Sequence, residues 1–84
     1  MHAVSHLEHV LDDPKQAEIV RHEAAEALGA LGSMGSLPLL EKHLQDHSQV
    51  IRETCELAVA RLKWQTSQLA KEEVLQPRYY DLKF

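Results

Sequence analysis

Apolar residues recur every three or four positions along most of the chain, which is the period of an amphipathic α-helix. Residues 3–12, 18–31 and 50–64 show this period most clearly. The positions that we expect to face the core are Val4, Leu7, Val10, Leu11, Val20, Ala24, Ala27, Leu28, Leu31, Ile51, Cys55, Ala58, Val59 and Leu62. No stretch alternates apolar and polar residues as a half-buried strand does, so the sequence predicts an all-α fold.

Turn-forming residues separate the helical stretches. Asp12-Asp13-Pro14 is expected to end the first helix, because the residue before a proline disfavours the helical conformation. Gly32 is a candidate C-terminal cap for the second helix, and residues 32–36 are the expected turn to the next one. Pro38 falls near the first turn of that following helix, where its missing N–H costs little.

The two halves of the chain resemble each other. Residues 3–13 match residues 36–46 with an offset of 33, and residues 20–24 match residues 51–55 with an offset of 31. The small change in offset corresponds to a gap in the Asp-rich link between helices. Because one helix pair cannot bury its apolar face alone, two such pairs predict a short α-solenoid.

The chain has 84 residues, so it is one small domain or a piece of a larger one, and its core is expected to be marginal. We divide it into a repeat at residues 1–32, a second repeat at residues 33–64 and a C-terminal helix or tail at residues 65–84. This division follows the internal repeat and the change in composition after it.

The C-terminal segment has a composition of its own. The aromatic residues all lie in the last 21 residues, as Trp64, Tyr79, Tyr80 and Phe84. The helix is expected to continue from Gln65 to Gln76 and to break at Gln76-Pro77. Two interpretations remain open: the tail covers the exposed end of the stack, or its aromatic side chains anchor another subunit or partner.

Charge and cysteine content exclude some functions. The net charge of −4 argues against nucleic acid as a partner, because phosphate binding requires a basic face. The single cysteine, Cys55, rules out an internal disulfide and fits a reducing compartment such as the cytoplasm. No apolar run approaches the roughly 20 residues that a membrane-spanning helix needs, and the N-terminus has no signal-peptide pattern.

His22 and Glu23 are the candidate metal ligands. Their helical position puts His22 almost opposite the predicted apolar stripe, next to the small residues Ala25 and Gly29, with Glu23 at the edge of the stripe. Imidazole and carboxylate suit zinc or non-haem iron, but two ligands are too few to hold a metal alone. Glu26 is four residues from His22 and is a candidate to orient it or to chelate with it.

The plain alternative is that His22 and Glu23 form a solvated helix face. Other histidines also have helical spacing, but we attribute them to polar helix faces: His2, His6, His9, His43 and His47. Cys55 aligns with Ala24 in the repeat and is expected to be a small, inert core residue.

The segments Val20–Leu31 and Val50–Val59 resemble the C-terminal end of deoxyhypusine hydroxylase, a HEAT-repeat family with a di-iron centre. In particular, the His-Glu repeat is followed by a repeat with Arg-Glu-Thr-Cys in the matching place. The resemblance covers residues 3–64, and the segment from Lys71 onward follows no pattern of the family that we recognise. It implies hydroxylation of a deoxyhypusine side chain on a translation initiation factor, using molecular oxygen.

The resemblance also implies an incomplete site. The family has four His-Glu motifs, and only the last has a counterpart here, so His22 and Glu23 carry over as iron ligands. We therefore expect a C-terminal fragment or truncated product of the enzyme, inactive by itself. Assembly with the missing N-terminal repeats, or self-association, would cover the apolar face of its first repeat.

Two other hypotheses stay open. In the first, the chain is a non-catalytic HEAT-repeat interaction module, or a relative such as a bilin-lyase-like repeat protein, in which His22 and Glu23 contact a partner. In the second, the chain forms a homo-oligomer in which several His22–Glu23 pairs converge on one metal.

Overall fold

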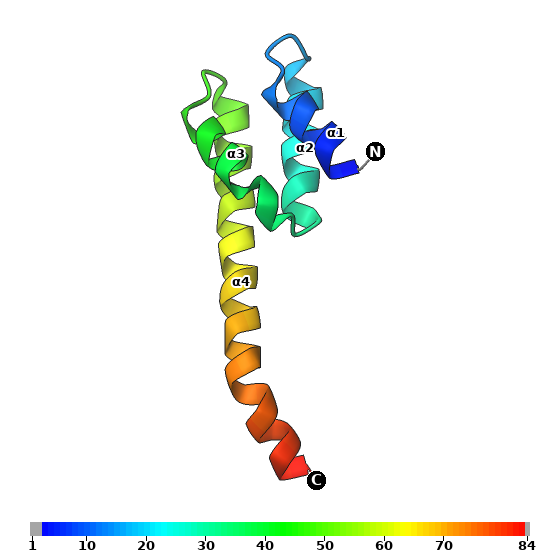
Figure 1. Cartoon of the computed structure of the whole chain (residues 1–84). Coiled ribbons are helices and arrows are strands. Elements are labelled where there is room, and N and C mark those ends of the chain that lie inside the picture. The colour runs from blue at the N-terminus through cyan, green and yellow to red at the C-terminus, as the bar shows by residue number, and fades with distance from the viewer. Residues whose placement is uncertain (1–2, 84) are drawn as a thin grey trace.

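A computed structural model describes the backbone of residues 3–83 and the side chains of residues 3–69. All regular secondary structure in the described residues is helical, which confirms the all-α prediction (Figure 1). Its elements are α1 (Ala3–Asp12), α2 (Glu18–Ala30), the 3-10 helix η1 (Met34–Ser36), α3 (Leu37–Lys42), the 3-10 helix η2 (His43–Gln45) and α4 (Gln49–Lys83).

The turns form where the sequence predicts them. The carboxylate of Asp13 accepts a hydrogen bond from the Lys15 backbone N–H at 2.9 Å, which closes the turn after α1. Gly32 has a φ of +70°, a left-handed conformation that glycine adopts without strain. The N–H of Ser33 then donates to the carbonyl of Leu28 at 3.2 Å, which satisfies one free carbonyl at the end of α2.

The helices form two antiparallel pairs that stack through their second members. In Figure 1 the α1–α2 pair lies beside the α3–α4 pair, with α2 against α4. The buried apolar residues form one cluster: Leu11, Ala24, Ala25, Leu28, Leu40, Ile51, Cys55, Ala58, Val59 and Leu62. All the core positions predicted in residues 50–64 belong to it, and Val4, Leu7 and Val10 pack against it from α1.

The buried face of α2 differs from the predicted one. Val20 and Leu31 are exposed, whereas Arg21, Ala25 and Gly29 are buried. The physical reason is that α2 has two neighbours: α1 covers one flank and α4 covers the other. The buried arc is therefore rotated by about 70° around the helix toward the small residues, at 100° per residue.

The C-terminal helix is longer than predicted, and the expected break at Gln76-Pro77 is wrong. The helix α4 continues to Lys83, and the ribbon in Figure 1 curves in this last part. A proline inside a helix removes one backbone hydrogen bond and bends the helix, and here it does not end it.

The helix α4 runs from the second repeat across the boundary that we expected at residues 64 and 65. It extends well past the other helices in Figure 1, and the molecule measures 56 × 28 × 17 Å. Trp64 is 62% exposed. The aromatic residues Tyr79, Tyr80 and Phe84 lie outside the part of the chain whose side chains are described, so both interpretations of the tail stay predictions.

Candidate functional site

The candidate metal ligand His22 lies where α2 meets α4, and a close helix contact sets its position. A Cβ placed on Gly29 would lie 3.0 Å from the Cβ of Ala58 and 3.2 Å from its Cα. Only glycine therefore lets α2 approach α4 this closely. The small residue Gly29 beside His22 thus makes room for another helix.

A hollow of about 240 Å³ lies over this contact, with His22 in its wall. It is lined by His22, Glu26, Gly29, Thr54, Leu57, Ala58 and Arg61. The Nδ1 atom of His22 lies 2.7 Å from the hydroxyl oxygen of Thr54 on α4. Because Leu57 is 72% exposed, the hollow opens directly to solvent next to the imidazole.

The two predicted metal ligands differ in their surroundings. His22 is half-buried and hydrogen-bonded across the repeats, whereas Glu23 is exposed and does not line the hollow. Glu26 lines the hollow, but the hydrogen bond to the imidazole involves Thr54. Within residues 3–69, no three His, Cys, Asp or Glu side chains gather closely enough to hold a metal ion.

The other histidines have varied roles. His6 and His9 are exposed in α1, as predicted, and His47 is 84% exposed. His2 lies outside the described residues. His43 contradicts the prediction of a polar surface position, because it is buried.

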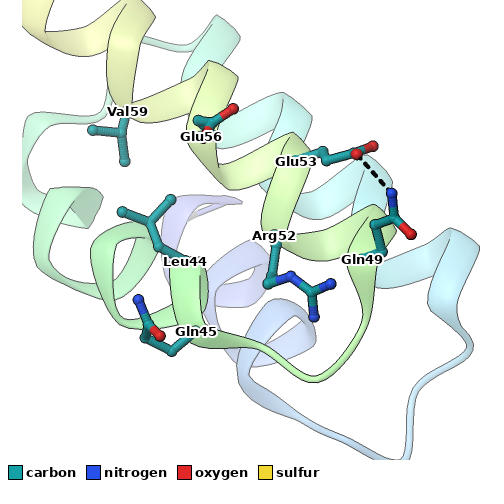
Figure 2. Close-up of a pocket in the computed structure, with 7 residues that line it drawn as sticks. All are labelled: Leu44, Gln45, Gln49, Arg52, Glu53, Glu56 and Val59. Carbon is teal, nitrogen blue, oxygen red and sulfur yellow. Dashed lines mark hydrogen bonds between the residues drawn. The ribbon is translucent and has the colours of Figure 1, made fainter.

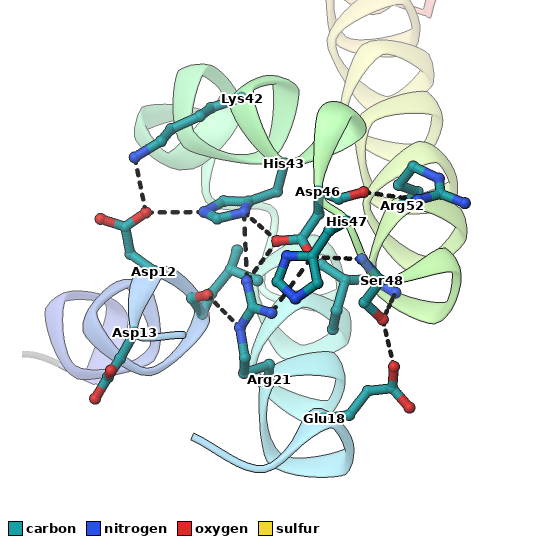
Figure 3. Close-up of polar contacts among 12 residues, drawn as sticks. Asp12, Asp13, Glu18, Arg21, Lys42, His43, Asp46, His47, Ser48 and Arg52 are labelled. Atoms are coloured by element: carbon teal, nitrogen blue, oxygen red, sulfur yellow. Dashed lines mark hydrogen bonds and ion pairs between the residues drawn. The ribbon is translucent and has the colours of Figure 1, made fainter. Parts of the chain in front are cut away.

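His43 belongs to a buried polar network between the two repeats, which sequence reasoning missed (Figure 3). Its Nε2 lies 2.8 Å from a carboxylate oxygen of Asp12, and its Nδ1 lies 2.8 Å from one of Asp46. Arg21 donates to the same Asp46 carboxylate at 2.5 Å and to the carbonyl of Leu11 at 2.9 Å. The network therefore ties the end of α1, the start of α2 and the turn before α4 into one unit.

The network strongly favours ionised carboxylates. Burial by itself raises the pKa of Asp46, but hydrogen bonds from Arg21, the Ser48 N–H and His43 more than offset this and hold the pKa well below its usual range. At Asp12, the hydrogen bonds from Lys42 and then His43 lower the pKa. Because the Asp46 and Arg21 side chains are each only 5% exposed, we assign this network a structural role.

The one cysteine, Cys55, is fully buried in the core and has no disulfide, which confirms the prediction of a small core residue. Burial, reinforced by the negative charge of Asp46, raises the pKa of its thiol to about 11. The thiol thus stays protonated and is a poor nucleophile and a poor metal ligand near neutral pH.

A second hollow, of about 600 Å³, lies between η2 and α4 (Figure 2). Three of its polar side chains form hydrogen bonds within the protein. Arg52 donates to the carbonyl of Asp46 at 2.8 Å, and Gln49 donates to Glu53 at 3.0 Å. Gln45 and Glu56 are the other polar residues that line it.

Stacked helical pairs with their second helices in contact define an α-solenoid. The comparison with protein families identifies the type of repeat. The HEAT repeat family matches residues 2–60, so the chain belongs to that family. Among the described residues, no helix combines the length and the hydropathy that crossing a membrane requires.

The most informative relatives are fungal enzymes. The chain is 51% identical to the deoxyhypusine hydroxylase of Candida albicans over 81 residues, which cover 95% of this chain and 26% of that protein. It is 52% identical to the deoxyhypusine hydroxylase of Kluyveromyces lactis, with 88% of this chain and 23% of that protein covered. For the Schizosaccharomyces pombe enzyme the identity is 49%, over 95% of this chain and 26% of that protein.

Two conclusions follow from these matches. The chain spans about a quarter of the length of these relatives. The similarity also extends through most of the segment after Lys71, which corrects our expectation that this part follows no pattern of the family. No solved structure matches the chain significantly.

Proposed function

We propose that this chain forms part of a deoxyhypusine hydroxylase and supplies His22 and Glu23 to its iron centre. The identity of about half of all residues with enzymes of that name is the observation that carries the proposal. The HEAT-type stack supports it, because it places a half-buried imidazole beside an open hollow. The reaction we assign to the complete protein is hydroxylation of a deoxyhypusine side chain on a translation initiation factor.

The internal repeat indicates how the site would be completed. His22 contacts Thr54 of the next repeat, and Thr54 aligns with Glu23 at the offset of 31. If the stack continues regularly toward the N-terminus, Glu23 lies beside the residue that precedes it by one repeat and corresponds to His22. A preceding repeat would thus place its own side chains next to Glu23 and provide further ligands of the shared centre.

The donor set fits iron as a contribution to a shared centre. An imidazole and a carboxylate are the ligand types of non-haem iron sites, and two of them leave most coordination positions open. Iron held there would supply the activation of molecular oxygen. The residues of this chain would hold the metal and, through the hollow lined by Glu26, Leu57 and Arg61, form one wall of the space beside it.

Exposed apolar residues on α2 support assembly with further repeats. Val20 and Leu31 lie on the face that neither α1 nor α4 covers, and Leu31 is 59% exposed. We propose that preceding repeats cover this face in the complete protein, and that self-association covers it when they are missing. The protein substrate is the other proposed partner, and the cytoplasm is the proposed location, because a single unpaired cysteine fits a reducing compartment.

A chimeric enzyme tests the proposal. The 84 residues would replace the matching region of the Candida albicans relative, and hydroxylation of its deoxyhypusine-bearing substrate would be measured. We expect the chimera to be active and the isolated chain to be inactive. A folded chimera without activity would contradict the proposal and would favour a non-catalytic interaction module.

A further inference from the structure

We propose that Thr54 positions His22 by fixing its tautomer, with the hydrogen on Nδ1 and the lone pair on Nε2. The inference deepens the proposed function, because it names the nitrogen that would bind the metal. It starts from the two contacts of one hydroxyl group. The oxygen of Thr54 lies 2.7 Å from His22 Nδ1 and 2.8 Å from the backbone carbonyl of Val50.

The hydroxyl of Thr54 has one hydrogen, and the carbonyl of Val50 can only accept. The hydroxyl therefore donates to Val50, one helical turn earlier, as threonines inside helices commonly do. Its oxygen keeps two lone pairs, which can accept but not donate. Both short contacts are satisfied together only when His22 Nδ1–H donates to Thr54.

This arrangement prepares the imidazole for a ligand. In a neutral ring with its hydrogen on Nδ1, Nε2 carries the free lone pair that a metal needs. Histidines that bind metals usually donate their other N–H to a protein oxygen, which sets the tautomer and the ring orientation. Here the oxygen comes from the next repeat, so stacking of the two repeats would itself prepare the ligand.

The position of Thr54 in the repeat adds to the argument. Thr54 takes the place that Glu23 has in the first repeat. A carboxylate at this position would place a negative charge beside the imidazole. A hydroxyl accepts the same hydrogen bond without a charge. The second repeat thus has an uncharged acceptor at the position where the first repeat has a carboxylate.

Nitrogen NMR of the ¹⁵N-labelled, metal-free 84-residue chain, recorded at mildly alkaline pH, tests the assignment. Long-range ¹H–¹⁵N spectra distinguish the two tautomers, and His22→Gln identifies the signals by their loss. We expect the Nδ1–H form in the wild-type chain. We expect Thr54→Val to shift His22 toward the Nε2–H form, which solvated imidazoles prefer, and Thr54→Ser to retain the Nδ1–H form.

Thr66→Val is the matched control. Thr66 lies on the same helix and donates to the carbonyl of Leu62 at 3.0 Å, also one turn back, and its other contact is the sulfur of Met34. Its replacement should leave the His22 signals unchanged. Circular dichroism would verify that each variant is folded, and Thr54→Ala would replace Thr54→Val if the latter unfolds.

The Nε2–H form in the wild-type chain, or an unchanged tautomer in Thr54→Val, would overturn the assignment. The readout contains no metal, so it is independent of the chimera experiment. An inactive chimera with the expected tautomers would refute the proposed enzyme while leaving the role of Thr54 intact.

Discussion

At the scale of single residues, the fold depends on a few polar side chains buried between the repeats. Arg21 and Arg52 occupy matching positions, and each donates to a backbone carbonyl near the end of the first helix of its own repeat. Arg21 also binds Asp46 of the other repeat, which makes it one of the polar links between them. A buried pair of this kind mainly penalises the loss of one partner, because the remaining charge is then left without compensation.

Asp46→Asn should therefore destabilise the chain by about 3 kcal/mol at neutral pH, a large share of the stability of a small domain. Because the pKa of Asp46 is lowered in the folded state, its contribution is present above the unfolded pKa of about 3.9 and is lost as the pH falls through the folded pKa. The wild-type chain should thus lose stability on acidification below about pH 4, and Asp46→Asn should lose less.

Urea unfolding at neutral pH and in acid measures both effects. Glu41→Gln is the control, because Glu41 is exposed and its 3.6 Å ion pair with Lys63 should contribute little. An equal dependence of stability on pH in Asp46→Asn and in the wild-type chain would contradict the assignment.

At the scale of elements, the apolar period predicted the buried stripe of α4 correctly and that of α2 incorrectly, although both helices pack against two neighbours. The stripe of α4 was predicted completely, from Ile51 to Leu62. The buried stripe of α2 is rotated relative to the predicted one. The contact between Gly29 and Ala58 on its second flank produces no apolar period in the sequence. The one sequence feature that indicated this helix contact was a small residue, Gly29, outside the predicted apolar stripe.

The stability of the contact between α2 and α4 should depend on the side-chain volume at position 29. Gly29→Ala gains about 1 kcal/mol of helix propensity but forces the helices apart, which costs about 2 kcal/mol, so we expect a net loss near 1 kcal/mol. In an Ala58→Gly background the 3.0 Å Cβ contact is gone and only the 3.2 Å contact with the backbone Cα remains, so we expect the same substitution to cost less. A double-mutant cycle of thermal unfolding measures this coupling, and equal effects in both backgrounds would show that the helices do not meet at this point.

At the scale of the whole molecule, the sequence predicted the α-solenoid but not the polar contacts between the two repeats. His43 and Arg21 are separated by 22 positions in the sequence and lie on different helices. The periodicity within a single helix therefore does not predict their contact. The internal repeat contained more information than we used. It pairs Arg21 with Arg52, which both donate to a backbone carbonyl, and Glu23 with Thr54, which contacts His22 across the repeats.

The uncovered face of α2 should govern how the isolated chain assembles. We expect the 84-residue chain to self-associate, because exposed apolar patches on short solenoids seek a partner. Val20→Glu with Leu31→Glu should make it monomeric in analytical ultracentrifugation. Leu57→Glu, an exposed apolar residue on the hollow, is the control and should leave the association unchanged. A wild-type chain that is monomeric at high concentration would contradict this prediction.

The central claim is that His22 binds iron in the complete protein, and the iron content of the purified chimera tests it most directly. We expect His22→Ala to lose most of the bound iron in elemental analysis. His47→Ala, which removes a histidine whose side chain is 84% exposed, should keep the wild-type iron content. Full iron loading in His22→Ala would contradict the account.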